Sequence, residues 1–215
     1  MRHAYPILLD VTDRLVVIVG GGAVAARKAA GVLEAGATRV RCVSPTFDPG
    51  MPEAVERVEA TYDASHLDGA GLVFAATDLP AVNDSVVRDA RARGVWVSRA
   101  DADEQDPGDF TVPAKWRSGP VTLAVSAGGS PALAAMIRDR LGNRWDARWT
   151  RMAEVLAWVR PRLRDGAVPP ALRLEILRDL ASDEAVEVLG AGDVKGLIDW
   201  VIRRHPGFPK VPSDG

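Results

Sequence analysis

Residues 15–28, with the sequence LVVIVGGGAVAARK, constrain the fold more than any other stretch of this chain. Four β-branched residues and a leucine lead into three glycines and then into helix formers, which predicts a buried strand, a tight turn and a helix. Gly20 is placed to make the turn, Gly22 to let a phosphate approach the backbone, and Ala25 to let the helix pack closely on the strand. The segment is predicted to bind the pyrophosphate of a dinucleotide at the helix N-terminus.

Strand and helix patterns then alternate over about 100 residues. Predicted strands cover residues 39–44, 72–76 and 95–97, the first helix stops near Gly36, and an amphipathic helix covers residues 83–93. The apolar start at residues 3–10 either adds an edge strand or packs under the sheet. This order predicts an α/β fold, a Rossmann-type doubly wound parallel sheet, over residues 1–113.

Composition narrows the class of protein. Of the 215 residues, 47% are hydrophobic and 26% charged, enough apolar material for a globular core. Cys42 is the single cysteine, which excludes a disulfide framework and a thiolate metal cage. No basic-then-apolar leader opens the chain, and no apolar run approaches the roughly 20 residues that span a bilayer. We therefore expect a cytoplasmic protein with no membrane partner.

Charge is unevenly distributed along the chain. The whole sequence has a net charge of -2, yet residues 114–165 carry 10 basic and 4 acidic side chains, a net charge of +6. A basic block on an acidic protein either binds a polyanion, such as nucleic acid or a small molecule, or forms the solvated face of a helix. Both interpretations stay open at this point.

Polar residues follow the predicted strands where open α/β sheets bind ligands. Thr77 and Asp78 come directly after the strand at 72–76, and Asp101 follows the next strand. The acids beyond Asp101 are expected to form a solvated loop; they are Asp103, Glu104, Asp106 and Asp109.

The acid that usually holds the ribose hydroxyls at the end of the second strand is missing, because residues 43–46 read VSPT. Backbone groups around residues 44–46 would then hold the ribose. Arg39 and Arg41 either favour a 2′-phosphate or form the solvent-facing side of their strand.

The second half of the chain has a different pattern. Residues 121–126 read as a strand outside the rhythm of the first sheet, and Pro131 opens a helix after a serine cap, so a new subdomain begins near Ala114. A helix at 145–164 carries a stripe predicted to be core or dimer contact: Trp145, Trp149, Met152, Leu156, Val159 and Leu163. Further helical stretches cover residues 172–180, 185–189 and 194–204.

Motifs spread over about 140 residues resemble the N-terminal module of siroheme synthase, the precorrin-2 dehydrogenase family. The matching stretches are YPILLD, VVIVGGGAVAARKAAGVLEAGA, FAATD with Asn83 five residues later, VWVSRAD, DFTVPA and LAVSAGGSPALAAMIRDRL. The family also lacks the ribose acid. Three features depart from its pattern: Ser98 replaces an asparagine, the loop from Asp101 to Phe110 is two residues longer, and Ala127 replaces a serine.

The resemblance implies an NAD-dependent oxidoreductase that converts precorrin-2 to sirohydrochlorin in siroheme biosynthesis. Asp101 matches the catalytic aspartate, and the longer loop makes Asp103 its rival. The implied cofactor residues are Gly20, Gly21, Gly22, Ala23 and Val24 at the pyrophosphate, Pro45 and Thr46 at the adenosine, and Thr77 and Asp78 along the cleft.

The resemblance also implies a homodimer formed through residues 114–150, followed by a helical region at 151–215. The tetrapyrrole substrate carries many carboxylates, which the basic block would complement. Candidate substrate residues are Ser126, Gly128 and Arg138, with Arg144 and Arg148 as looser candidates. Some family members also insert ferrous iron into sirohydrochlorin, but His3, His66 and His205 form no convincing ligand set, and we predict no metal site.

A second class of function explains the glycine turn and the basic block equally well. A non-catalytic NAD-sensing module would bind a partner or nucleic acid through its arginines. No helix-turn-helix and no aromatic RNA-binding pattern accompanies those arginines, so we expect no nucleic acid partner.

Overall fold

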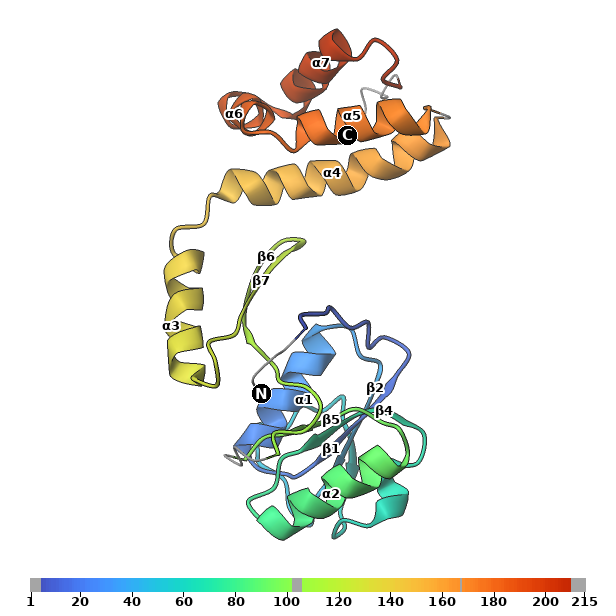
Figure 1. The fold of residues 1–215 in the computed structure, drawn as a ribbon, viewed down its shortest axis with the longest axis vertical. Coiled ribbons are helices and arrows are strands. Elements are labelled where there is room, and N and C mark those ends of the chain that lie inside the picture. The colour runs from blue at the N-terminus through green and yellow to red at the C-terminus, as the bar shows by residue number, and fades with distance from the viewer. Residues whose placement is uncertain (1–4, 102–105, 167, 210–215) are drawn as a thin grey trace. The chain divides into compact units, whose positions relative to one another are not determined.

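The computed structural model describes residues 5–101, 106–166 and 168–209 (Figure 1). Its contacts divide the chain into two compact units, Met1–Val112 and Pro113–Gly215. In the part of the chain that the structure describes, no helix combines the length and the apolar character needed to cross a membrane.

A five-stranded parallel sheet forms the centre of the first unit, with the strand order β3-β2-β1-β4-β5. The strands are β1 (Leu15–Val19), β2 (Arg39–Val43), β3 (Glu56–Val58), β4 (Ala70–Ala75) and β5 (Val97–Arg99). Every residue of the central strand β1 is buried, as its continuous apolar sequence predicts. This order is the Rossmann arrangement, so the predicted fold class is confirmed.

The two main helices of this unit pack on opposite faces of the sheet (Figure 1). Val16 and Ile18 share a buried cluster with residues of α1 (Ala23–Glu34). Leu15, Val17 and Val19 share another with residues of α2 (Pro80–Ala92). Alternate residues of a strand point to opposite faces, so these two clusters show that the sheet is covered on both sides.

Several predicted boundaries in this unit are wrong. The edge strand β3 was not predicted, because two of its three residues are charged. β5 begins at Val97 and not at Val95, because the Val95 N–H still bonds the Ala90 carbonyl at 3.0 Å and closes the end of α2. Residues 5–10 form no strand, so the first alternative for this segment is wrong. Leu9 is partly buried and packs against the cluster on the α1 face of the sheet, as the second alternative predicts, while Tyr5 and Leu8 are each 89% exposed.

The second unit begins with an antiparallel hairpin of β6 (Ala114–Ser118) and β7 (Val121–Val125). The sequence predicted only the second of these strands, and β6 is its missing partner. The helix α3 (Pro131–Gly142) packs against both strands, and Ser130 caps it by accepting a hydrogen bond from the Leu133 N–H.

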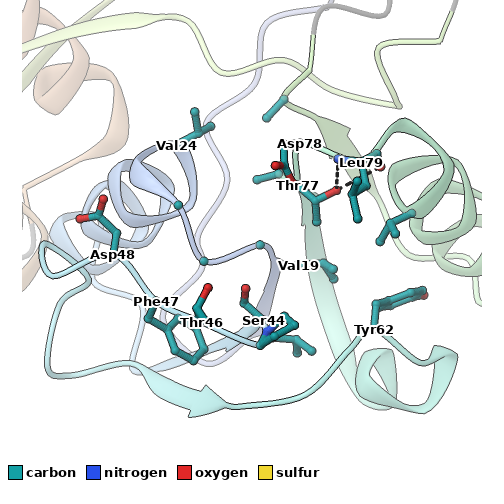
Figure 2. A pocket seen from close by; sticks show the side chains of 18 of the residues that line it. Val19, Val24, Ser44, Thr46, Phe47, Asp48, Tyr62, Thr77, Asp78 and Leu79 are labelled. Atoms are coloured by element: carbon teal, nitrogen blue, oxygen red, sulfur yellow. Dashed lines mark hydrogen bonds between the residues drawn. The ribbon is translucent and has the colours of Figure 1, made fainter.

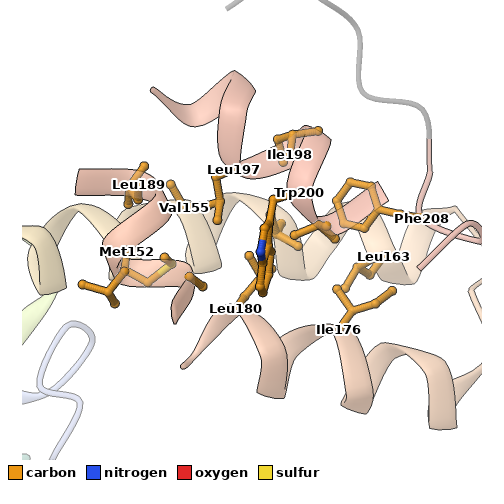
Figure 3. Close-up of a cluster of buried hydrophobic side chains, with 14 of the residues drawn as sticks. Met152, Val155, Leu163, Ile176, Leu180, Leu189, Leu197, Ile198, Trp200 and Phe208 are labelled. Atoms are coloured by element: carbon orange, nitrogen blue, oxygen red, sulfur yellow. The ribbon is translucent and has the colours of Figure 1, made fainter. Parts of the chain in front are cut away.

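Four further helices share one core, α4 (Ala147–Asp165), α5 (Pro170–Leu180), α6 (Asp183–Ala191) and α7 (Val194–Arg204). Figure 3 shows side chains of all four helices gathered around Trp200. The predicted stripe on α4 is correct for Met152, Val159 and Leu163, which are buried. Trp149 is 46% exposed and packs edge-on against Trp145, so it lies outside this core, and its alternative role as a dimer contact stays a prediction.

Candidate cofactor and active site

A cleft of about 670 Å³ opens in the first unit where the strands β1, β2, β4 and β5 end (Figure 2). Parallel sheets bind their ligands at this carboxyl edge because loops from several strands converge there. Residues 19–24, 43–48, 60–62, 76–79, 82 and 100–101 line the cleft. The nine predicted cofactor residues and Asp101 all lie among them, although their individual roles stay predictions.

The glycine turn is held tightly between the ends of β2 and β4. Gly20 has a φ of +135°, and a Cβ added to it would lie 2.3 Å from the Ala76 carbonyl oxygen. A Cβ on Gly21 would lie 1.9 Å from the Thr46 carbonyl oxygen. Both positions therefore require glycine for steric reasons, whereas the motif alone assigned no role of its own to Gly21.

Gly22 has the opposite environment. It is the N-cap of α1, no side chain caps the helix there, and a Cβ added to it would meet nothing within 4 Å. The first N–H groups of α1 thus face the cleft without a side-chain partner at the cap. A helix N-terminus of this kind attracts anions through its free N–H groups and its dipole. The site therefore fits the pyrophosphate of a dinucleotide.

Asn83 connects the walls of the cleft on the side of β4 and β5. Its fully buried amide accepts from the Thr77 N–H at 3.2 Å and lies 2.8 Å from the Thr77 hydroxyl. Its Nδ2 donates to the Thr77 carbonyl at 3.0 Å and to Oδ2 of Asp101 at 2.8 Å. The amide therefore holds the loop after β4 and the loop after β5 in one arrangement.

Arg99 holds the other side of Asp101. Its guanidinium is only 3% exposed and donates to Asp101 from Nε at 2.5 Å and from Nη2 at 3.0 Å. Nη1 pairs with Asp84 of α2. A buried guanidinium is stable only when it is paired, so Arg99 and Asp101 fix each other in position.

This environment sets the charge of Asp101. Burial raises the pKa of the carboxyl, but the hydrogen bonds from Arg99 and Asn83 lower it by more, and the pKa lies below its ordinary value. Asp101 is therefore ionised at neutral pH, and it presents a fixed carboxylate to the cleft.

The lowered pKa makes the contribution of Asp101 to stability depend on pH. Because the folded-state pKa lies below the unfolded value of about 3.9, the carboxylate stabilises the fold above that value and loses this effect as the pH falls through the folded-state pKa. We expect the free energy of unfolding of the protein to exceed that of Asp101→Asn at neutral pH, and the difference to shrink in acid. Urea unfolding at pH 7 and at about pH 3 measures both values, and a difference that grows in acid would contradict this pKa shift.

Comparison with known proteins identifies the family to which the part of the chain that forms this cleft belongs. The model of the family described as "Putative NAD(P)-binding" matches residues 7–114, half of the chain. This chain belongs to that NAD(P)-binding family. The match covers the whole sheet and the glycine turn, and it bears out the predicted NAD cofactor.

Relatives of this NAD(P)-binding protein are siroheme synthases. Those of Methylobacillus flagellatus, Nitrosomonas eutropha and Nitrosospira multiformis are 36%, 36% and 33% identical over 165, 205 and 223 residues. The matches cover 74%, 92% and 98% of this chain but 35%, 42% and 46% of those proteins, so the chain spans less than half of their length. They confirm the resemblance to the N-terminal part of siroheme synthase.

A solved structure shares the fold. The chain of "SirC, precorrin-2 dehydrogenase" matches with a TM-score of 0.75 and 23% identity, covering 93% of this chain and 100% of that one.

The loop after β2 supplies an acid that the sequence prediction missed. Asp48 lines the cleft of this NAD(P)-binding unit, and its N–H bonds the Gly21 carbonyl at 2.7 Å. The sequence signal that could have identified Asp48 is its position as the first acidic residue after β2. Neither Arg39 nor Arg41 lines the cleft, and Arg41 pairs with Glu56 at 3.0 Å, so the prediction that they favour a 2′-phosphate has no support in the geometry.

Asn83 and Arg99 are the other residues whose roles sequence reasoning missed. Asn83 lies at helical spacing with the buried residues Val86, Val87 and Ala90, and a polar residue on such a stripe was the available signal. Arg99 lies inside β5 and was predicted to follow it.

Two acids predicted to be solvated have structural partners. Arg91 of α2 bonds Asp106 at 2.8 Å and Asp109 at 2.9 Å, and the Asp109 N–H bonds the Val97 carbonyl at 2.7 Å. These contacts anchor the segment that returns from the Asp101 loop along β5. Asp103 and Glu104 lie outside the described residues.

The predicted substrate residues belong to the second unit, and their role stays a prediction. Ser126 and Gly128 follow β7, and Arg138 of α3 pairs with Asp139 at 2.7 Å. Arg148 pairs with Asp146 and Glu187, and Arg144 is exposed.

The histidines that the structure describes have structural partners. Nδ1 of His66 accepts the Asp63 N–H at 3.0 Å, and His205 lies 2.9 Å from Asp179. Within the described residues, no group of three or more His, Cys, Asp or Glu side chains is arranged to hold a metal ion.

Proposed function

We propose that this protein oxidises precorrin-2 to sirohydrochlorin with NAD+ in siroheme biosynthesis. The observation that carries the proposal is the pairing of two features in one cleft. Asp101 is held in place and ionised at one end, and at the other end the N-terminus of α1, which has no side-chain cap, follows the glycine turn. The pathway is proposed from the relatives, which are siroheme synthases, and the substrate from the structural neighbour, which is named a precorrin-2 dehydrogenase.

The residues that line the cleft assign a different part of the cofactor to each of its two ends. The backbone N–H groups of residues 20–24 hold the pyrophosphate, and Pro45 and Thr46 lie on the β2 side, where the adenosine is expected. Thr77, Asp78 and Asp101 lie on the β4 and β5 side, where the nicotinamide is expected. When bound there, NAD+ supplies the acceptor for a hydride.

Asp101 takes the proton that leaves the tetrapyrrole. Its carboxylate is ionised at neutral pH, so it can accept this proton without first losing one. Arg99 and Asn83 orient it, and a well-placed general base contributes about 10²- to 10⁴-fold to a rate. The low pKa makes it a weak base, so position and not basicity is what the surrounding groups provide.

The substrate is a polycarboxylate, and the basic block at residues 114–165 complements it with a net charge of +6. Within this block we propose Ser126, Gly128 and Arg138 as substrate contacts. Arginine suits this task because its planar guanidinium binds carboxylates through two hydrogen bonds.

We also propose that residues 114–150 form a dimer contact. All of these residues are described, and Ala134 is the one buried side chain among them. Leu133, Met136 and Leu141 of α3 are between 42% and 48% exposed. Such an apolar surface is typical of an interface between subunits, and light scattering that finds a monomer at micromolar concentration would contradict it.

We further propose a cytoplasmic location, which the single buried Cys42 supports.

Anaerobic absorbance of the purified protein with precorrin-2 and NAD+ tests the proposed function. We expect NADH and sirohydrochlorin to appear together. A second cuvette with sirohydrochlorin and ferrous ion tests iron insertion, in which iron is a substrate and no resident metal is needed. No reaction in the first cuvette, with NAD+ still bound, would overturn the dehydrogenase and favour an NAD-sensing module.

A further inference from the structure

We propose that Asp48 makes this cleft select NAD over NADP by holding the adenosine ribose and repelling a 2′-phosphate. This inference rests on the proposed function, because it concerns the same cofactor in the same cleft. It adds a specificity residue where the usual ribose acid is missing.

Asp48 is built into the wall of the cleft on the β2 side. Its N–H donates to the Gly21 carbonyl at 2.7 Å, which draws the loop after β2 back to the glycine turn. Its Oδ1 accepts the Gly50 N–H at 2.7 Å, which fixes the carboxylate. Figure 2 shows the Ser44, Thr46 and Asp48 side chains on this wall, beside the start of α1.

The position of Asp48 matches the end of the cleft where adenosine lies. In Rossmann folds, the residues after the second strand contact the adenosine ribose, and the pyrophosphate lies at the first helix. Asp48 follows β2, its N–H contacts the turn that precedes α1, and the residue lines the cleft at this end. A ribose with a free 2′-hydroxyl can donate a hydrogen bond to it, and a ribose 2′-phosphate cannot.

The negative charge of the residues that line the cleft also favours NAD over NADP. Among the described residues that line it, the charged side chains are Asp48, Asp78 and Asp101, and none is Lys or Arg. The nearby Arg57 donates instead to the Met51 carbonyl at 2.8 Å and lies over the Phe47 ring. A 2′-phosphate adds about 1.5 to 2 negative charges, and no Lys or Arg stands among the described residues that line the cleft to balance them.

The size of this effect is large enough to measure. Repulsion between two unit charges 4 Å apart weakens binding by about fivefold in bulk water and by several hundredfold at the effective dielectric of a protein surface. A hydrogen bond from a ribose hydroxyl to a carboxylate strengthens NAD binding by about tenfold or more. Asp48 therefore favours NAD through both effects.

Titration calorimetry of the full chain with NAD+ and with NADP+ tests the proposal. We expect the protein to bind NAD+ at least about tenfold more tightly than NADP+, and Asp48→Asn to reduce this preference by about tenfold or more. Asparagine keeps an oxygen that can accept the Gly50 N–H, so the variant removes the charge and preserves the turn.

Asp78→Asn is the matched control, because it removes the same charge at the other end of the cleft. We expect it to change both affinities by the same factor. An unchanged preference in Asp48→Asn, an equal change of preference in Asp78→Asn, or equal binding of both cofactors by the unmodified protein would overturn the proposal and leave the dehydrogenase intact. If the unmodified protein binds neither cofactor, the proposed function fails with it.

Discussion

Asp101→Asn is expected to slow NADH formation from precorrin-2 by orders of magnitude while NAD+ binding persists. Asparagine cannot take a proton from the substrate, so we expect the turnover rate to fall by about 10²- to 10⁴-fold. The pyrophosphate site lies on other residues of the cleft, so the affinity for NAD+ should change little. Steady-state kinetics and calorimetry on the same preparation separate the two effects.

Asp84→Asn is the control for this experiment. Asp84 pairs with the same Arg99, is 61% exposed, and leaves the Asp101 carboxylate in place. We expect this variant to keep most of its turnover. Full activity in Asp101→Asn would remove Asp101 from the catalytic role and make Asp103 the next residue to test.

Gly22→Ala is expected to lose affinity for NAD+ and keep its stability, whereas Gly21→Ala is expected to lose stability. The Gly22 methyl group would meet no protein atom within 4 Å, and its φ of -79° suits alanine, so stability should fall by less than about 1 kcal/mol. The methyl group would occupy the approach to the α1 N–H groups. Loss of one hydrogen bond to a charged phosphate costs about 1.5–3 kcal/mol, so the affinity for NAD+ should fall by about tenfold to a hundredfold.

The Gly21 methyl group would lie 1.9 Å from the backbone oxygen of Thr46, which cannot move without the loop after β2. Overpacking of this kind costs about 1–3 kcal/mol of stability. Urea unfolding should therefore show a clear loss for Gly21→Ala and almost none for Gly22→Ala. Equal stability losses in the two variants would contradict the assignment of Gly21 to packing and Gly22 to the ligand.

The fold of the first unit was predictable because its signals are local. The run of residues 15–28 specifies a strand, a turn and a helix within one window, and a parallel sheet follows from repeating that unit. The edge strand β3 was not predictable in this way, because its pairing with β2 stabilises three residues that carry little pattern of their own. The strand β6 was missed for a similar reason, since three of its five residues, Lys115, Arg117 and Ser118, are polar and leave little apolar pattern.

Some features of the candidate site were likewise predictable from local sequence, and others depended on contacts between elements. The sequence by itself determined that the glycine turn, Thr77 and Asp101 meet at one edge of the sheet, because parallel strands place their carboxyl ends together. Only the tertiary structure decided what surrounds Asp101, because Asn83 and Arg99 reach it from α2 and β5 through side chains whose direction no sequence pattern encodes. The same holds for Asp48, which lines the cleft where a hydrogen bond from its N–H to the Gly21 carbonyl holds its loop against the turn. Local periodicity specifies elements, whereas contacts between elements depend on packing in three dimensions, and the partners that fix the charge and position of Asp101 arise from that packing.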